Sequence, residues 1–343
     1  MIASALRRIV MDSLGRRPGG PSRDLTAARL AVAACLVAAS ACRRGPTPSS
    51  TSATPPLAAI EARAALNLPV SRAATSLDRE PDWIVTASRS ELRIVGDPFV
   101  IATIPRDPGH GFSALDKGHD RDDLYVLPIA QALDGVRAEA DGVVGAPTND
   151  VPDPATRSAR AKRVLAIAAD ASTTYRLFAE VVAAAAPFGL EGGLVVAVRA
   201  GSGVGVIPLR IQPSPGPRHE ALAQFGCGLG CVEGLVVVVG RDGVTVEAPS
   251  SGAKDDCGDG TRVPLASDGA QDVAAVEALV ARLVARVPQS GHSKIRERIV
   301  WIEADPEIDL ATLVSVIDAT IGPPTARRFD FVAPLAPRKK AAP

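Results

Sequence analysis

The chain has 343 residues, and its 38 Lys and Arg residues balance 38 Asp and Glu residues, so the formal net charge is zero. This balance excludes a broad electrostatic attraction to nucleic acid or to anionic lipid. The hydrophobic fraction of 46% allows a sizeable core, whereas the aromatic fraction of 3% argues against a surface that stacks nucleic-acid bases.

The N-terminus has the organisation of a lipoprotein-type signal peptide. The Arg-rich residues 1–29 precede the apolar run Leu30–Ala41, which at 12 residues is too short to span a bilayer, since a span needs ~20. Small residues at 39–41 then precede Cys42, and this arrangement resembles a bacterial signal whose cysteine is lipidated and becomes the mature N-terminus. We therefore expect a lipid on Cys42. A cleaved signal without lipid, a retained membrane helix and a start at Met11 are the alternatives.

Composition divides the rest of the chain into two similar domains joined by a Pro-rich linker. Pro, Ser and Thr in residues 43–56 favour an extended tether after the signal. The expected order is signal peptide 1–42, flexible tether 43–79, first domain 80–212, linker 213–229, second domain 230–336 and tail 337–343.

The first domain opens with a predicted hairpin. Trp83–Ala87 has the composition of a strand, residues 88–90 can turn, and Leu92 and Ile94 alternate with Arg93 as in a half-exposed strand. A polar insertion at 96–123 follows. The next apolar stripe predicts a helix in which Pro128 is tolerable only in the first turn; it comprises Val126, Ile129, Leu133 and Val136.

The stretch Val164–Glu191 occurs twice. It contains an apolar strand, an Ala-Asp pair, a polar turn and a helix, and Ile299–Ala326 repeats this order 135 positions later, with Asp170 matching Asp305. The helix stripe at Tyr175 recurs at Leu310 with the same spacing. Strands at 194–198, 204–211 and 329–332, a hairpin at 235–246 and a helix at 273–283 complete the two copies.

The predicted fold class is therefore α+β, with two similar domains. Each is expected to have the order β-β-α-β-α-β, with two helices packed on one face of a small mixed sheet.

This order of elements and the local sequences within it resemble the periplasmic domain of the ExbD/TolR family of biopolymer-transport proteins. The family pattern is a hairpin, a helix with a Leu-rich face, a strand ending in Ala-Asp, a polar turn, a helix of the type LxxVxDAxxxxG, and a last strand. The matching segments are VTVE (244–247), VAAVEALVARL (273–283), IVWIEADPEIDLATLVSVIDA (299–319), FDFVAP (329–334), VLAIAADASTTYRLFAEVV (164–182) and GLEGGLVVAV (189–198).

One departure from the family limits what the resemblance implies. Members that transduce the proton-motive force have a transmembrane helix with an Asp, whereas Leu30–Ala41 has none. The resemblance thus implies a non-enzymatic, lipid-tethered periplasmic interaction module that assists envelope transport or cell-wall anchoring. Its implied partners are an ExbB/TolQ-like or TonB-like protein, peptidoglycan, or a second copy, and no nucleic acid. An envelope hydrolase with its site in residues 96–123 and a purely structural lipoprotein remain alternatives.

Asp170 and Asp305 are the repeated acidic residues. Each lies where a strand ends and a helix begins, so we expect helix N-caps rather than catalytic groups. No catalytic residue, cofactor or metal ligand is expected. His110 and His119 lie with acidic residues in the polar insertion, but sparse His and Asp in a loop are usually solvated.

The cysteines outside the signal peptide favour a disulfide if the chain is exported, because that compartment is oxidising. Cys231 precedes the first strand of the second domain and Cys257 follows the second strand, so the hairpin brings them together. This pair is preferred, with Cys227 as the second candidate. Its loop of ~25 residues would stabilise the fold by about 3 kcal/mol. Cys35 lies in a competing signal box.

Overall fold

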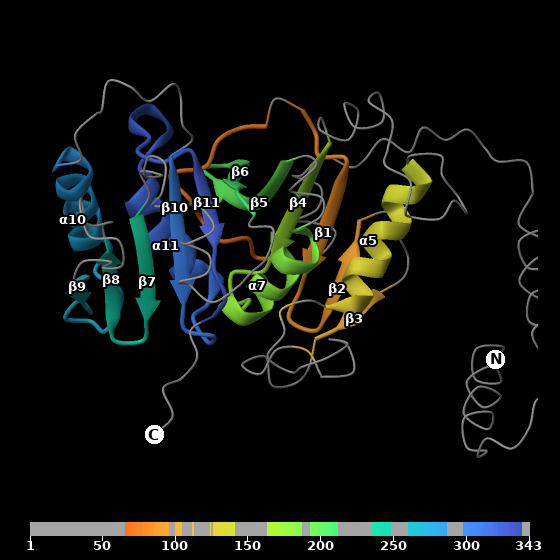
Figure 1. The fold of residues 1–343 in the computed structure, drawn as a ribbon, viewed down its shortest axis with the longest axis horizontal. Coiled ribbons are helices and arrows are strands. Elements are labelled where there is room, and N and C mark those ends of the chain that lie inside the picture. Colours follow the sequence, from red (N-terminus) through yellow and green to blue (C-terminus); the bar gives the residue numbers. More distant parts are fainter. Residues whose placement is uncertain are drawn as a thin grey trace, which may run out of the picture. The chain divides into compact units, whose positions relative to one another are not determined.

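One continuous sheet forms the centre of the described structure. The computed structural model describes residues 66–77, 79–95, 100–104, 112, 124, 126–140, 163–186, 193–211, 235–247, 260–286 and 298–337. All of them belong to one compact unit, Thr54–Pro343. Within it, 11 strands lie in the order β3-β2-β1-β4-β5-β6-β11-β10-β7-β8-β9 (Figure 1).

The first half of the sheet contains six of these strands. Leu92 and Ile94 are buried and Arg93 is exposed, as the alternation predicts, and Pro128 lies in the first turn of its helix. The elements are β1 (Trp83–Ala87), β2 (Glu91–Ile94), β3 (Val100–Thr103), α5 (Leu127–Ala140), β4 (Val164–Ala169), α7 (Tyr175–Ala184), β5 (Gly193–Ala200) and β6 (Gly203–Leu209).

The second half repeats the order of the first half up to β5. Its hairpin requires a glycine at 243, where φ is +135° and a Cβ would lie 2.3 Å from the carbonyl oxygen of Val263. The elements are β7 (Leu235–Gly240), β8 (Gly243–Glu247), β9 (Thr261–Pro264), α10 (Val273–Arg286), β10 (Ile299–Ala304), α11 (Leu310–Ile321), a 3₁₀ turn η2 (Pro324–Ala326) and β11 (Phe331–Pro334).

Strand directions reverse between the two halves. In the first, β1, β4 and β5 are mutually parallel. In the second, β7, β10 and β11 are mutually parallel. Strand β6 is antiparallel to β5 and parallel to β11, which it meets at Leu209 and Val332, so the parallel strands of the two halves run in opposite directions. The strand order and directions of the two halves are therefore those that a two-fold rotation would produce, about an axis that passes through β6 normal to the sheet.

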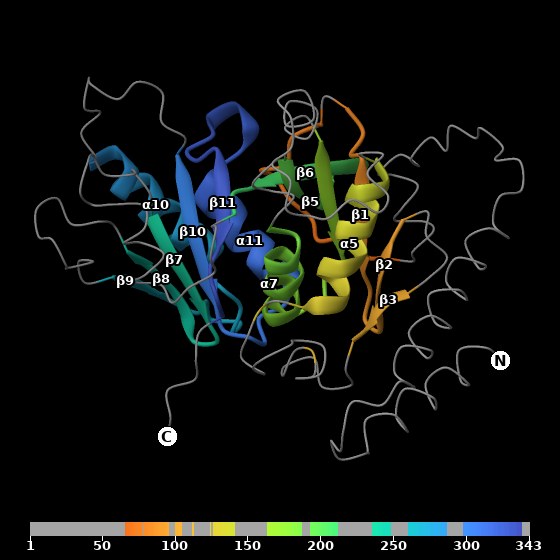
Figure 2. The ribbon, with the colours of Figure 1, turned by 45° about the vertical axis from the view of Figure 1, so that its right-hand side comes forward.

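The expected fold class of two separate small domains is therefore wrong. The sheet does not end at the last strand of each copy, because β6 and β11 pair with each other. The four α-helices of the described residues pack on one face, over a single apolar cluster that includes Ile167 and Val196 from the first half and Ile302 and Val332 from the second. The continuous core explains the fusion, since separating the halves would expose this surface to water. Figure 2 shows α7 and α11 next to each other near the middle of the sheet.

The opposite face of the first half is covered by residues 66–77, which we call the strap. Leu66 and Leu68 are buried there against Ile84 of β1, Ala166 of β4 and Val206 of β6. The strap lies within the stretch expected to be a tether, yet it is packed on the sheet. In the described part of the chain, no helix is both long enough and apolar enough to cross a bilayer.

Candidate functional site

The two Ala-Asp turns have the same backbone arrangement. The amide of Asp170 donates to the carbonyl oxygen of Ala87 at 2.9 Å, and the amide of Asp305 donates to that of Val239 at 2.9 Å. Each Asp carbonyl then accepts from the residue three positions later, at 2.8 Å for Thr173 and 3.1 Å in the second turn. Each Ala-Asp pair thus closes a tight turn at the carboxyl end of two parallel strands.

The carboxylate of Asp170 is fully engaged with its surroundings. Its oxygens accept from the amide and hydroxyl of Ser172 at 2.9 and 2.5 Å and from the amide of Asn67 at 3.1 Å. Burial raises the pKa of Asp170, but the hydrogen bonds from Ser172 and Asn67 and the charge of Arg89 outweigh it, so that the pKa lies below its ordinary value. Asp170 therefore stays ionised near neutral pH and organises backbone groups.

Asp305 holds the equivalent hairpin in the second half. Its carboxylate accepts from the amide of Arg241 at 3.0 Å. The Arg241 side chain pairs with Glu307 at 2.9 Å, much as Arg89 donates to Ser172 at 3.0 Å in the first half.

The helix caps differ from those predicted. The N-cap of α7 is Thr174, and that of α11 is Asp309, whose side chain accepts from the amide of Thr312 at 2.7 Å. Asp170 and Asp305 lie four positions upstream of these caps, because a further turn of backbone separates each strand from its helix. They are turn residues that brace a neighbouring segment.

The two turns contact each other and exchange hydrogen bonds in matched pairs. The amide of Tyr175 donates to Ile308 at 2.7 Å, and the amide of Leu310 donates to Thr173 at 2.8 Å. A second matched pair joins Arg176 to Pro306 at 3.1 Å and Ala311 to Ala171 at 2.9 Å. In both pairs, a shift of 135 positions converts one bond into the other, so the contact is symmetric between the halves. Within the described residues, no hydrogen bond joins the carboxylates of Asp170 and Asp305 themselves.

Tyr175 adds a contact that has no counterpart in the second half. Its ring is fully buried, and its hydroxyl lies 2.8 Å from the carbonyl oxygen of Ile302 and 2.7 Å from that of Leu335. Burial, with a smaller effect from Glu303, raises the pKa of Tyr175 far above its ordinary value. The phenol therefore remains a hydrogen-bond donor, and it holds α7 of the first half to β10 of the second.

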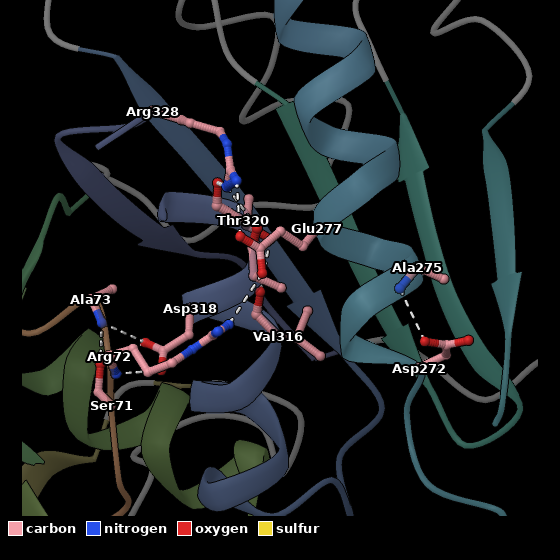
Figure 3. Close-up of polar contacts among 11 residues, drawn as sticks. Ser71, Arg72, Ala73, Asp272, Ala275, Glu277, Val316, Asp318, Thr320 and Arg328 are labelled. Atoms are coloured by element: carbon pink, nitrogen blue, oxygen red, sulfur yellow. Dashed lines mark hydrogen bonds and ion pairs between the residues drawn. The ribbon is translucent and has the colours of Figure 1, made fainter. Parts of the chain in front are cut away.

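A buried carboxylate on α11 anchors the strap (Figure 3). Asp318 is 5% exposed and accepts from the hydroxyl of Ser71 at 2.5 Å, the amide of Arg72 at 2.6 Å and the amide of Ala73 at 3.2 Å. Three donors thus compensate for the burial of one charge, which would otherwise be strongly unfavourable. At the matching position of α7 the chain has Ala183, so this anchor occurs in the second half alone.

An ion-pair chain extends the anchor to the surface. Arg72 pairs with Glu277 of α10 at 3.2 Å, and Glu277 pairs with Arg328 at 3.1 Å. Arg328 also donates to the carbonyl of Ala319 at 3.0 Å, near the end of α11. Because the Arg72 side chain is 64% exposed, this pair contributes little, and Asp318 supplies most of the attachment.

The remaining candidate residues lie outside the described part of the chain. These are Cys42, Cys227, Cys231, Cys257, His110 and His119. Among the described residues, no group of three or more His, Cys, Asp or Glu side chains could hold a metal ion. An apolar hollow between Ala183 of α7 and Pro334 measures about 20 Å³, which is room for about one water molecule.

Comparisons with known proteins leave the family open. No family model matches the chain, and no curated protein is significantly similar to it. A crystal structure of the ethanolamine utilization protein EutJ from Carboxydothermus hydrogenoformans aligns over 77% of this chain and 88% of that chain, at 11% identity and a TM-score of 0.20. A TM-score this low does not indicate a shared fold.

The sequence placed Tyr175 on the apolar stripe of its helix, where it is buried, but it did not reveal the bridging role of the Tyr175 hydroxyl or the pairing of Asp318 with Ser71. Asp318 had a detectable signal, because an acidic residue next to the apolar stripe of α11 must either reach solvent or find buried donors. Ser71 had none, since its partner is distant in sequence.

Proposed function

We propose that this chain is a non-enzymatic interaction module of the bacterial envelope, attached to a membrane through Cys42 and resembling ExbD/TolR periplasmic domains. One observation carries the proposal. Residues 71–73, within the stretch expected to be the tether, are fixed to the folded unit by three hydrogen bonds to the buried Asp318. A secure attachment between tether and fold is what a module held at a membrane requires.

The carboxylate of Asp170, in the first Ala-Asp turn, supports the same view. Asp170 accepts three hydrogen bonds from its own chain and has a lowered pKa, which suits a structural anion better than a general acid. The proposed role is assistance to envelope transport or cell-wall anchoring, with an ExbB/TolQ-like or TonB-like protein, peptidoglycan or a second copy as partner.

The two end strands differ as places for a partner strand. Strand β9 carries the exposed Arg262 and ends at Pro264, features that discourage pairing at an edge. Strand β3 has neither, and Val100 is 40% exposed. We therefore place the partner contact of the module at β3.

Photo-crosslinking in membranes tests this function. A photo-reactive amino acid is placed at Val100 on β3, and matched probes are placed at Thr261 on β9 and at the exposed Ala281 on α10. We expect a membrane-dependent crosslink at Val100 to a channel-type or energy-transducing protein, and its loss in Cys42→Ala. Isolation of the chain alone from membranes at all three probes would contradict the interaction role and favour a purely structural lipoprotein.

A further inference from the structure

The second half of the sheet buries a row of apolar side chains on the face away from its helices. Val236 of β7 pairs with Trp301 of β10, and Trp301 pairs with Ala333 of β11. These three residues are 5%, 2% and 0% exposed. With their neighbours they form an apolar cluster separate from the main core, which we call the outer cluster: Val236, Val238, Ile299, Trp301, Phe331, Ala333 and Leu335.

The matching row of the first half lies under the strap. Ile84 of β1 pairs with Ala166 of β4, and Ala166 pairs with Val195 of β5. All three belong to the cluster that contains Leu66 and Leu68 of the strap. The strand registers therefore make this row the counterpart of the row through Trp301, and in the first half the cover of that row is known.

The outer cluster also has a cover. Among the residues that the structure describes, only β7, β10, β11 and Leu335 contribute to it. A sheet face must pack against another element to leave water, and an indole at 2% exposure has left it. The covering segment therefore comes from the chain outside the described ranges.

The chain before β7 has the position and the length for this role. Strands β1 and β7 begin at Trp83 and Leu235, so the shift of 152 that relates them carries the strap, residues 66–77, to residues 218–229. This stretch offers Leu222 and Phe225 as apolar side chains. The 23 residues from 212 to 234 can reach about 75 Å when extended, whereas β6 and β7 are three strand spacings apart, or about 15 Å.

The polar anchor of the strap has been replaced consistently at both of its matching positions. The shift of 152 puts Ala223 in place of Ser71, and the shift of 135 puts Ala183 in place of Asp318. A hydroxyl and a carboxylate are thus both exchanged for methyl groups, which leaves no unpaired buried charge. Ala183 also lines the apolar hollow near Pro334.

We propose that residues 218–229 form a second strap, which lies across the outer cluster as residues 66–77 lie across the first half. Apolar contact holds it in place of the hydrogen bonds to Asp318. The stretch expected to be part of an interdomain linker is then an element of the second half. This proposal goes beyond the envelope role and does not depend on it, because its tests use the purified full-length chain without membranes.

Photo-crosslinking identifies the segment that covers the outer cluster. A photo-reactive phenylalanine analogue replaces Phe331, which is only partly buried in the cluster, and a matched probe replaces the exposed Ala281 on α10. We expect an intramolecular crosslink from position 331 to residues 218–229, located by mass spectrometry, and none from position 281. A crosslink from position 331 to residues 1–65, to another segment or to a second copy would overturn the proposal.

Fluorescence quenching tests the cover from the other side. Phe225→Ser places a hydroxyl against the apolar face, so acrylamide quenching of Trp301 should rise at least about twofold in a Trp83→Phe background, because the indole loses its apolar cover. Quenching of Trp83 in a Trp301→Phe background should not change, which distinguishes a local effect from unfolding. Ser214→Ala, in the same connection but outside residues 218–229, is the matched control. Unchanged quenching of Trp301, or an equal rise at both Trp residues, would overturn the second strap.

Discussion

Replacing Tyr175 by Phe tests the contact between the halves. The change removes one buried hydroxyl that lies within 2.8 Å of Ile302 and Leu335 and leaves the ring in the core. The donated hydrogen bond is lost, and the buried carbonyl oxygens of Ile302 and Leu335 no longer have a donor from this side chain. Such a loss costs about 1–3 kcal/mol of unfolding free energy. The ring remains in place, so cavity formation adds little.

The natural fluorophores allow the two halves to be followed separately. The chain has two Trp residues, with Trp83 in β1 and Trp301 in β10. Single-Trp versions made by Trp→Phe substitution are unfolded in urea with and without Tyr175→Phe. Because one core connects the halves, we expect coincident transitions for both probes, displaced together by the loss of 1–3 kcal/mol.

A matched variant separates the effect of bridging from that of hydroxyl removal. Thr320 is fully buried and its hydroxyl donates within its own helix, to Val316 at 2.8 Å. Thr320→Val should leave the two transitions coincident and cost about 1 kcal/mol or less. The reasoning is refuted if Tyr175→Phe changes stability by under about 0.5 kcal/mol, or if the unmodified chain shows two separate transitions.

Asp170→Asn should remove a stabilising term that is present above about pH 4 and lost as pH falls through the lowered native pKa, because the carboxylate is ionised more readily when folded. Acid unfolding curves that coincide with those of the unmodified chain would contradict this. Tyr175 has a raised pKa, so its contribution is intact below about pH 10 and declines as pH rises further; absorbance titration should show that it does not ionise before alkaline unfolding. Gly243→Ala forces a Cβ to 2.3 Å from the carbonyl oxygen of Val263 at a φ of +135°, and we expect a loss of at least about 2 kcal/mol by urea titration. Gly201→Ala, at a φ of +58° with open space around it, should cost about 1 kcal/mol, and equal losses at the two sites would argue against the steric explanation.

The local elements were largely readable from the sequence, because period and turn chemistry are local properties. Alternation at Leu92–Ile94 gave a strand, and the position of Pro128 limited where α5 begins. The short edge strands β3 and β9 were not predicted, since four residues carry too little periodicity.

The sequence did not reveal that the two halves share one continuous sheet. Within the sheet, the halves meet at one strand pairing, Leu209 with Val332, between residues more than 120 positions apart. Neither strand shows in its own sequence which strand it pairs with, and only the continuous apolar face of the structure shows that they belong together. For the same reason the partners of Asp170 and Asp318 could not be assigned, because Asn67 and Ser71 come from a stretch whose composition favours a tether.

Strand β6 has no counterpart in the second half, since that half ends its sheet pairing at β11. Features away from the axis strand, such as the β1–β2 and β7–β8 hairpins, therefore occur twice. A molecule that recognises what the two hairpins share would saturate at two equivalents per chain. At the axis strand the pairing is lost, because one neighbour of β6 is antiparallel and the other is parallel. Ligands of that strand would saturate at one equivalent, so stoichiometry alone can tell which kind of surface a newly found ligand occupies.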